Sequence, residues 1–278
     1  MSHRVVVITG ASAGIGAALA EVLSARGAAV VLAARREDKL AEVARKCGRL
    51  GLQPGDGFAQ GRADTLVVAA DVTKRAEVDR IRDEALSRFG HIDVWVNNAG
   101  RGITRNVSEL TDEDIDEMIT VNVKSALYGM QTVLKHFSER QRGQIINVSS
   151  MLGRVPLAPF RSAYSASKHA LNALTASLRM ELKTKIPNVM VTSVHPGIVQ
   201  TEFGLNALHG GMDSRKLPSS QTAEEVATVI ADAIEHPRAD VYTREGARQM
   251  VAGYFGAEDM AAAEAALGPP PAPPAGRT

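Results

Sequence analysis

Two residues with complementary chemistry stand four positions apart in the run AYSASKHALNALTASL: the phenol of Tyr164 and the ammonium of Lys168. On a helix this spacing places both side chains on one face. A phenol ionises near pH ~10, so proton exchange at neutral pH requires a shift of roughly 3 units, or about 4 kcal/mol. A neighbouring cation favours the phenolate, and the pair therefore predicts Tyr164 as a proton donor or acceptor. The competing interpretation is an ordinary half-buried aromatic residue followed by a solvated lysine.

A hydroxyl group stands at the end of an expected strand upstream. The segment QIINVSS predicts a buried strand over 144–148 that ends in two serines, the second of which is Ser150. The carboxyl ends of parallel strands open into the crevice where α/β sheets bind ligands, so we expect Ser150 to meet Tyr164 there. The alternative is that Ser150 serves only as a turn former or helix cap.

Three glycines near the amino terminus predict a dinucleotide site. In RVVVITGASAGIGAALAEVLSARGAAVVLAARR, an apolar run is followed by Gly10, Gly14 and Gly16, an amphipathic stretch and a second apolar run. Such a strand, turn, helix and strand unit lets the backbone approach a pyrophosphate and directs a helix N-terminus at it. The spacing Gly-x-x-x-Gly-x-Gly departs from the commoner Gly-x-Gly-x-x-Gly, and a purely structural turn is the alternative.

The end of the second expected strand indicates which coenzyme binds. An Asp or Glu there would accept the ribose hydroxyls of NAD(H), but this position is Ala34, followed by Arg35 and Arg36. A 2′-phosphate would meet up to two guanidinium groups, each worth roughly 1.5 to 3 kcal/mol. We therefore predict NADP(H), with Arg35 as the better phosphate ligand. The alternative for Arg36 is the exposed first turn of the next helix.

The elements that must position these residues alternate along the chain. Apolar runs predict strands over 4–9, 29–33, 65–69, 92–96, 144–148, 189–194 and 239–242, with helical patterns between them, including long ones over 112–137 and 162–183. Alternating strands and helices predict an α/β protein, a single-domain Rossmann fold whose doubly wound, seven-stranded parallel sheet is flanked by helices.

Three segments depart from this alternation. Residues 48–64 predict a loop insertion at the face opposite the crevice, and residues 268–278, GPPPAPPAGRT, predict a Pro-rich disordered tail after a catalytic domain over 1–267. Glycines and apolar residues over 202–220 predict a mobile substrate lid. Together with the segment MLGRVPLAPFRS at 151–162, the lid favours an apolar carbonyl or alcohol as substrate; packing of a lid or a subunit contact explains the same residues equally well.

A series of motifs in one order carries a resemblance to a known family. TGASAGIG, NNAG at 97–100, Asn122, Ser150, the pair Tyr164 and Lys168, and PGIVQT at 196–201 make the chain, from about residue 4 to about residue 245, similar to the classical short-chain dehydrogenase/reductase family. The resemblance implies that Ser150 binds the substrate oxygen and Tyr164 transfers the proton. Lys168 would lower the tyrosine pKa and hold the nicotinamide ribose, and Asn122 would anchor a water in the proton relay.

The same resemblance and the motif arguments together give the expected coenzyme contacts. The residues expected to bind NADP(H) are Gly10, Ser12, Gly14, Ile15, Gly16, Arg35, Arg36, Asp71, Val72, Asn98, Ala99, Gly100, Tyr164, Lys168, Pro196, Gly197, Val199 and Thr201. Within this set Asp71 would touch the adenine and Thr201 the carboxamide. The implied reaction interconverts a carbonyl and a secondary alcohol by hydride transfer, with Tyr164 as general acid or base.

Composition and net charge limit the kinds of partner and cellular location that we expect for this protein. The net charge of +1 gives no reason to expect nucleic acid or an anionic membrane, and scattered histidines with a single cysteine, Cys47, give none to expect a metal or an internal disulfide. No apolar run approaches the ~18 residues that span a bilayer, and no signal peptide is recognised, so we expect a cytoplasmic protein. The resemblance further implies a homodimer or homotetramer.

Three other protein classes would share part of this pattern. A catalytically silent dinucleotide-binding regulator or scaffold would keep the glycine-rich turn but would have no need for Asn122, Ser150, Tyr164 and Lys168 together. An enoyl-thioester reductase of the same fold would place its Tyr and Lys seven residues apart. A nucleotide-sugar epimerase would have a larger C-terminal domain than this chain offers.

Overall fold

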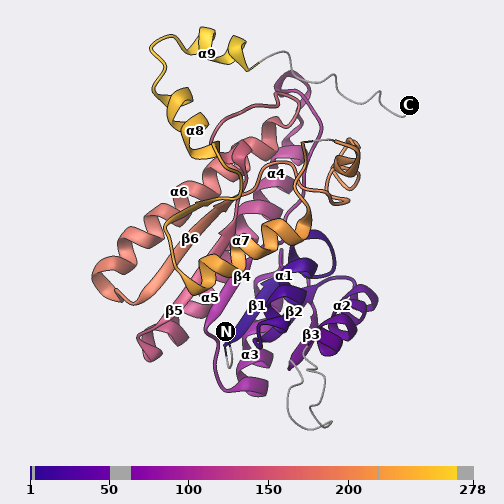
Figure 1. The fold of residues 1–278 in the computed structure, drawn as a ribbon, viewed down its shortest axis with the longest axis vertical. Helices are drawn as coiled ribbons and strands as arrows, with labels where there is room; N and C mark the ends of the chain where they lie inside the picture. Colours follow the sequence, from indigo (N-terminus) through magenta and orange to yellow (C-terminus); the bar gives the residue numbers. More distant parts are fainter. Residues whose placement is uncertain (2–3, 51–63, 218, 268–278) are drawn as a thin grey trace.

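One parallel sheet organises the chain. The computed structural model describes residues 1, 4–50, 64–217 and 219–267, and within them seven strands pair in the order β3-β2-β1-β4-β5-β6-β7 (Figure 1). The strands are β1 (Val5–Thr9), β2 (Ala29–Ala34), β3 (Thr65–Ala69), β4 (Val94–Asn97), β5 (Gly143–Val148), β6 (Val189–His195) and β7 (Asp240–Tyr242). Because the strand order reverses between β1 and β4, a crevice is expected at their carboxyl ends. The predicted fold class is confirmed.

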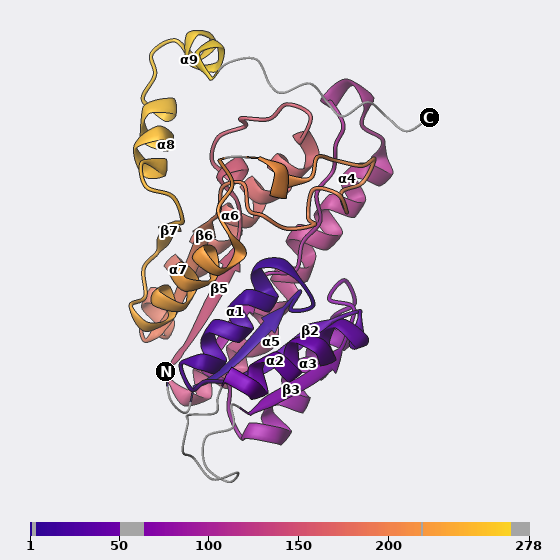
Figure 2. The same ribbon diagram turned by 45° about the vertical axis from the view of Figure 1, so that its right-hand side comes forward.

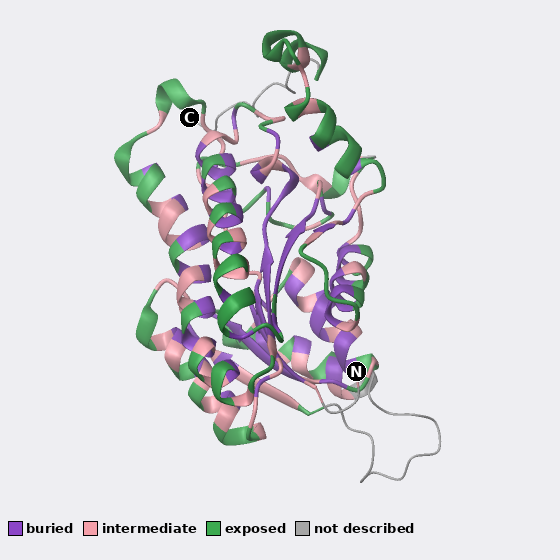
Figure 3. Ribbon diagram, turned by 90° about the vertical axis from the view of Figure 1, so that its left-hand side faces the viewer, coloured by how far each residue is buried: buried purple, intermediate pink, exposed green. Residues whose placement is uncertain are grey.

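Helices cover both faces of the sheet (Figure 3). One layer contains α1 (Gly14–Ala25), α2 (Glu37–Leu50) and α7 (Ala223–Glu235), and the other contains α3 (Arg75–Phe89), α5 (Ser125–Arg140) and α6 (Ser162–Lys185). Alternate strand residues point to opposite faces, so Val6 and Ile8 join the first layer while Val5 and Val7 join the second. Burial on both faces explains why the strands read as continuous apolar runs.

The helical pattern over 112–137 is not one helix. It divides into α4 (Asp112–Ile119), a π-helical turn (Thr120–Lys124) and α5. A π turn accommodates one extra residue, and such bulges occur frequently at functional sites. The turn contains Asn122, one of the predicted site residues. The expectation of a continuous helix was wrong because apolar periodicity does not register a single added residue.

Two predicted boundaries move by a few residues. Helix α2 continues to Leu50, so the expected insertion does not begin at Gly48; its remainder over 51–63 and the predicted tail over 268–278 lie outside the described residues. Helix α6 ends at Lys185, two residues beyond the predicted end.

The chain continues past β7 into two short helices, α8 (Ala247–Phe255) and α9 (Met260–Ala266), which extend from the carboxyl end of the sheet (Figure 2). Ala247 and Val251 of α8 pack against Met151 and Val155. Helix α8 therefore supports the segment that follows β5, where Ser150 lies. Among the described residues, no helix combines the length and the apolar character needed to cross a membrane.

Candidate active site

The glycine-rich turn lies against the segment that follows β4. Gly10 has a φ of +67°, and a Cβ added there would lie 2.8 Å from the Cα of Ala99. Gly14 has a φ of +56°, and its Cβ position is 3.0 Å from Cγ2 of Thr201. Only glycine fits such positions without strain. Three motifs far apart in the sequence, at residues 10–16, 98–99 and 201, are thereby brought together.

Hydrogen bonds fix this junction between β1 and β4. The Asn98 side chain donates from Nδ2 to the carbonyl oxygen of Thr9 at 2.9 Å. The Thr9 hydroxyl in turn accepts from the backbone nitrogens of Asn98 at 3.0 Å and Ala99 at 3.1 Å. These backbone groups, which border the crevice at the strand-order reversal, therefore have hydrogen-bond partners within the protein.

The two arginines after β2 lie in different surroundings. Nη2 of Arg36 donates to Oγ of Ser12 at 3.2 Å, so Arg36 reaches the glycine-rich turn. Arg35 lies near Asp71; burial raises the pKa of this carboxyl, but hydrogen bonds from Thr73 and the charges of Arg35 and Lys74 outweigh it and lower the pKa. Both arginines are exposed. The sequence favours Arg35 as the phosphate ligand, whereas the structure brings Arg36 to the turn.

Asn122 uses its whole amide to hold the loop after β4. Oδ1 accepts from the backbone nitrogen of Arg101 at 2.9 Å, and Nδ2 donates to the carbonyl of the same residue at 3.0 Å and to Oγ of Ser167 at 3.1 Å. The Cβ position of Gly100 lies 3.0 Å from this Oδ1 and 3.6 Å from Nζ of Lys168. Asn122 thus joins the π-helical turn to α6 at the point where Lys168 reaches the crevice.

Lys168 is a buried ammonium with a backbone partner. Its Nζ donates to the carbonyl oxygen of Val148, the last residue of β5, at 2.9 Å, and lies 5.7 Å from the ring centroid of Tyr164. The two side chains therefore face one region, as the four-residue spacing predicts. Burial lowers the pKa of Lys168 to about 8, because a charged amine loses hydration in this position.

Tyr164 is a buried phenol whose surroundings in the protein keep it protonated at neutral pH. Burial raises its pKa to about 12, and this effect outweighs the hydrogen bond with Ser150 and the charge of Arg161, which both lower it. The sequence predicts a pKa lowered by Lys168. In the coenzyme-free chain the direction is opposite, because loss of hydration exceeds the stabilisation that these neighbours give to the phenolate.

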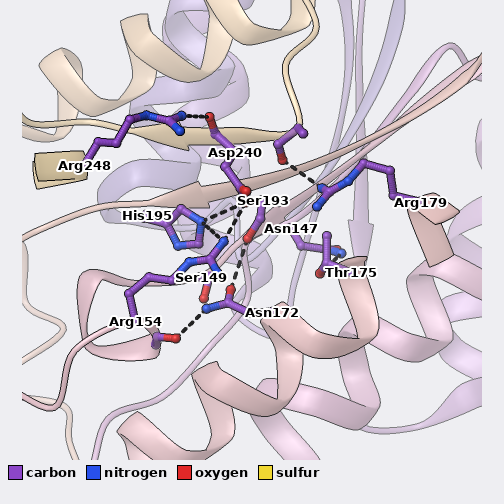
Figure 4. Close-up of polar contacts among 12 residues, drawn as sticks. Asn147, Ser149, Arg154, Asn172, Thr175, Arg179, Ser193, His195, Asp240 and Arg248 are labelled. Atoms are coloured by element: carbon purple, nitrogen blue, oxygen red, sulfur yellow. Dashed lines mark hydrogen bonds and ion pairs between the residues drawn. The ribbon is translucent and has the colours of Figure 1, made fainter. Parts of the chain in front are cut away.

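A polar network braces the segment that carries Ser150 (Figure 4). Ser150 caps the 3-10 helix η3 (Met151–Gly153) by accepting from the nitrogen of Leu152 at 3.1 Å. Behind it, Nδ2 of Asn172 donates to the carbonyl of Gly153 at 2.6 Å, and Ser193 donates to Oδ1 of Asn172 at 3.1 Å. Helix α6 and strand β6 therefore hold η3 from two sides.

A charged group on β7 holds the same segment from a third side. Nη2 of Arg154 contacts Oδ1 of Asp240 at 2.7 Å and Nε2 of His195 at 3.2 Å. His195 is fully buried, which lowers its pKa, and its ring stacks on Tyr242 with centroids 4.9 Å apart. His195 therefore combines packing with a polar contact.

Part of the predicted lid covers the Tyr164 side chain. Phe203 places its ring edge toward the phenol, with centroids 5.6 Å apart, and Leu208 and Ile103 join Tyr164 in one apolar cluster. The lid pairs with the loop after β4 through the backbone, since Leu208 donates to Gly102 at 2.9 Å and Thr104 donates to Leu208 at 3.0 Å. Residues 203–208 of the predicted lid therefore lie over the tyrosine in this structure.

A charged contact fastens the closed lid. His209, at a φ of +58°, places Nε2 2.7 Å from Oδ1 of Asp114 at the start of α4, and Nη1 of Arg105 lies 2.8 Å from the other carboxylate oxygen. Burial raises the pKa of Asp114, but hydrogen bonds from His209, Thr111 and Arg105 lower it to about 2. Sequence reasoning missed this contact because its partners are 95 residues apart.

Arg161 is a second residue that sequence reasoning missed. It caps α6 three positions before Tyr164, and its guanidinium lies between the lid and the loop after β4, with Nη1 donating to the carbonyl of Ile103 at 3.2 Å. The spacing of three residues, one helical turn, was the available signal. The charge of Arg161 is one of the two influences that lower the pKa of Tyr164.

The remaining predicted coenzyme residues follow the carboxyl ends of β1, β3 and β6. Ile15 and Val72 are partly buried against the two helical layers, and Val199 is buried. The carbonyl of Pro196 accepts from the nitrogen of Met151 at 2.9 Å, and the Cβ position of Gly197 lies 3.0 Å from Cδ of Arg244. Of the residues that the structure describes, no three from His, Cys, Asp and Glu gather closely enough to hold a metal.

Comparisons with known proteins agree with this geometry. The family model described as short chain dehydrogenase matches residues 4–209. The "Uncharacterized oxidoreductase YxnA" of Bacillus subtilis is 36% identical over 248 residues, which cover 87% of this chain and 65% of that protein. The chain therefore spans about two thirds of the length of this relative.

Two solved structures share the fold. A short chain dehydrogenase/reductase from Burkholderia phymatum in complex with NAD is 26% identical and superposes with a TM-score of 0.81, over 92% of this chain and 94% of that one. An alcohol dehydrogenase from the archaeon Thermococcus sibiricus complexed with 5-hydroxy-NADP is 28% identical, with a TM-score of 0.73 over 86% of this chain and 95% of that one.

Replacing the buried ammonium should stabilise the coenzyme-free protein at neutral pH. A lysine with a folded pKa of about 8 and an unfolded value of 10.5 binds fewer protons when folded, so its unfavourable contribution is complete below pH 8 and disappears as the pH rises through 10.5. We expect Lys168→Met to raise the free energy of unfolding by roughly 1 to 3 kcal/mol at pH 7 and by less at pH ~9.5.

Urea unfolding of the coenzyme-free protein at the two pH values measures this difference. Lys183→Met, which removes an exposed lysine from the same helix, is the matched control and should change stability little at either pH. A Lys168→Met protein that is less stable than the parent at pH 7, or a difference that does not change with pH, contradicts the assignment.

Proposed function

The chain belongs to the short-chain dehydrogenase/reductase family, oxidoreductases that act on CH–OH and C=O groups, and from this premise we propose that it interconverts a carbonyl and a secondary alcohol with NADP(H), using Tyr164 as the proton donor and acceptor. The observation that carries the proposal is the burial of Tyr164, Ser150 and Lys168 together at the carboxyl end of β5, where the Ser150 hydroxyl is close enough to Tyr164 to lower the pKa of the phenol.

The chain's own residues suit a dinucleotide. The backbone at Gly10, Gly14 and Gly16 has no room for a Cβ, which favours a turn that a pyrophosphate can approach closely, and α1 begins at Gly14 with its N-terminus toward that turn. Thr201 faces Gly14 across the crevice and suits the nicotinamide end. When bound, the coenzyme exchanges a hydride with the carbonyl carbon; the protein supplies orientation and the proton.

Ser150 and Tyr164 present two donors to one oxygen. Both residues are buried, at 8% exposure each, so a carbonyl oxygen between their hydroxyls would exchange water for two preorganised donors. Because the pKa of Tyr164 is about 12, the phenol carries its proton at pH 7 and starts as a general acid for reduction. In the oxidative direction, cationic charge near the phenol would have to lower this pKa.

Lys168 and Asn122 act on position and charge. The ammonium, held by Val148 and close to Gly100, would stabilise the phenolate left after proton transfer and would donate to a ribose hydroxyl. Asn122 keeps the 100–101 loop beside this ammonium through its contacts with Arg101. The predicted role of Asn122 is to anchor a water, which requires a hydrogen-bonding position that its present contacts do not use. The side-chain oxygen has a second lone pair that could accept a hydrogen bond from this water.

Removal of the phenolic hydroxyl should abolish turnover without loss of coenzyme. We expect Tyr164→Phe to lower kcat by about 100-fold or more, since a positioned general acid contributes on the order of 10² to 10⁴, while the dissociation constant for NADPH stays within about threefold. A screen of ketones, aldehydes and alcohols with NADPH and NADP+, followed by nicotinamide absorbance and by coenzyme fluorescence, measures both quantities.

Tyr242→Phe is the control for this experiment, because it removes a phenol that lies on β7 and stacks on His195. Turnover that survives Tyr164→Phe, or coenzyme binding without turnover across the whole screen, would favour the silent regulator instead.

Coenzyme preference should depend on Arg36 more than on Arg35. Arg36 reaches Ser12 in the glycine-rich turn, so its guanidinium stands where a 2′-phosphate of a bound NADP(H) is expected. We expect Arg36→Gln to lower kcat/KM for NADPH by about 10- to 100-fold and to leave kcat/KM for NADH nearly unchanged. Arg35→Gln, with the same charge change, should have the smaller effect. A parent enzyme equally efficient with NADH, or a coenzyme ratio unaffected by both variants, refutes the NADP(H) assignment.

A further inference from the structure

Arg161 places a guanidinium group at the mouth of the proposed substrate site. It precedes Tyr164 by one helical turn, so the two side chains extend toward the same region. Its Nη1 lies 3.0 Å from the Cβ position of Gly102, at a point that is also 3.0 Å from Cε1 of Phe203. Phe203 in turn packs edge-on against the Tyr164 ring. The guanidinium and the reactive phenol thus lie on either side of the lid phenylalanine, which contacts the region of both.

The lid backbone is shaped around this cation. Nη2 of Arg161 lies 3.1 Å from the Cβ position of Gly211 and 3.8 Å from that of Gly204. The segments around the two glycines also pack closely. A Cβ at Gly204 would collide with the carbonyl oxygen of Met212, and a Cβ at Gly211 would collide with that of Gly204. Glycine at both positions therefore lets the closed lid approach the guanidinium directly.

Neighbouring arginines have carboxylate partners, but Arg161 has none within the described part of the chain. Arg105 pairs with Asp114 at 2.8 Å, Arg101 pairs with Glu117 at 3.0 Å, and Arg215 pairs with Asp213 at 2.8 Å. Of the five N–H donors of a guanidinium, the one hydrogen bond that Arg161 makes with described residues goes to the Ile103 carbonyl. The side chain is half-buried, and desolvation lowers its pKa.

A half-buried charge without an opposite charge is unfavourable in an apolar enclosure. The walls here are Ile103, Leu152, Leu208 and Phe203, all hydrophobic, and the Phe160 ring lies 5.7 Å from the guanidinium carbon. The unfavourable charge needs a functional reason, and a ligand that carries one negative charge would supply the missing partner.

The geometry points to Arg161 as the residue that binds a carboxylate of the substrate, so that the enzyme acts on a short oxo acid or the corresponding hydroxy acid. This inference rests on the proposed function, because it places the carbonyl of that acid at Ser150 and Tyr164. The charge of Arg161 acts on the Tyr164 phenol, and Phe203 lies close to both side chains, so a short acid suffices to join the carbonyl and the carboxylate.

A carboxylate suits this position better than a phosphate. One planar guanidinium matches one carboxylate in a two-bonded arrangement, whereas a phosphate ester carries more charge than a single half-buried arginine balances. The apolar walls remain consistent with an apolar carbon skeleton, so the predicted apolar character applies to the body of the substrate and the carboxylate to one end. Binding of that carboxylate beside Gly204 and Gly211 would also hold the lid closed over the reacting groups.

Matched acids and esters test the assignment. The substrates are pyruvate, acetoacetate and levulinate, each measured beside its methyl ester with NADPH. We expect the parent enzyme to prefer the acid of the best pair by about 10- to 100-fold in kcat/KM. Arg161→Gln should remove this preference by lowering kcat/KM for the acid about 10- to 100-fold more than for the ester; an effect of the lost charge on Tyr164 acts on both substrates and cancels in this ratio. Arg161→Lys, which retains the charge without the fork, should restore part of the preference.

Two controls separate recognition from folding. Arg142→Gln removes an exposed arginine between α5 and β5, so it makes the same change in net charge and should leave the preference intact. Thermal melting of each variant shows whether it is folded. An equal loss on acid and ester in a folded Arg161→Gln protein, or a parent that prefers the esters, overturns the inference.

A binding measurement makes the result independent of turnover. Calorimetry with butyrate and with butyramide, in the presence of NADP+, should show tighter binding of butyrate to the parent and no difference for Arg161→Gln. Equal binding of the two probes to the parent overturns the role of Arg161. If the enzyme reduces only neutral carbonyls and Tyr164→Phe abolishes this activity, the carboxylate inference is refuted and the proposed function stands. If no carbonyl is turned over in a Tyr164-dependent way, the proposed function itself fails.

Discussion

The site depends on one constraint: a phenol and an ammonium are buried next to each other, and no carboxylate among the described residues pairs with either. Burial raises the pKa of Tyr164 to about 12 and lowers that of Lys168 to about 8, so at pH 7 the phenol is neutral and the amine is still protonated but close to its pKa. Each is poised to change protonation state when charge arrives nearby. A tyrosine in solvent would ionise at a lower pH. One added charge would shift its pKa less, however, because water screens the interaction between the charge and the phenol.

The scaffold satisfies this constraint by separating polar from apolar positions along each strand. The strands are largely apolar and become polar towards their carboxyl ends, where Asn97 of β4 lies beside Asn147 of β5 and Ser150 follows β5. A buried hydrogen-bond chain runs from Trp95 through Asn97 and Asn147 to Thr175 on α6, with distances of 2.8 Å at each link. Such a chain fixes the relative positions of β4, β5 and α6 because each amide loses a partner if any element moves.

The local parts of the structure follow from the sequence, and the long-range contacts do not. All seven strands lie within two residues of their predicted bounds, since runs such as VVVIT and QIINV fit only buried parallel strands. The assembly of residues 10–16, 98–100 and 201 follows once those strands are parallel. By contrast, apolar periodicity did not reveal the π-helical turn at Asn122, because one added residue leaves the pattern on either side intact.

Electrostatic surroundings were the hardest feature to anticipate. Whether Arg35 or Arg36 reaches the glycine-rich turn depends on how the chain bends into α2, and the direction of the Tyr164 pKa depends on the lid that covers it. The contacts of the lid with Asp114 and Arg161 join residues from four separate segments. A sequence states which of these groups exist, but packing decides which of them lose water and which gain partners.

The central claim is that Tyr164 is a buried neutral phenol whose acidity depends on charge supplied with the coenzyme. The most direct measurement is an ultraviolet titration of phenolate absorbance for the parent protein minus Tyr164→Phe, with and without saturating NADP+. The account predicts that the coenzyme-free difference spectrum shows ionisation only near the pKa of about 12, and that NADP+ lowers this midpoint by at least about one unit. A midpoint near pH ~10 that is the same in both samples would contradict it.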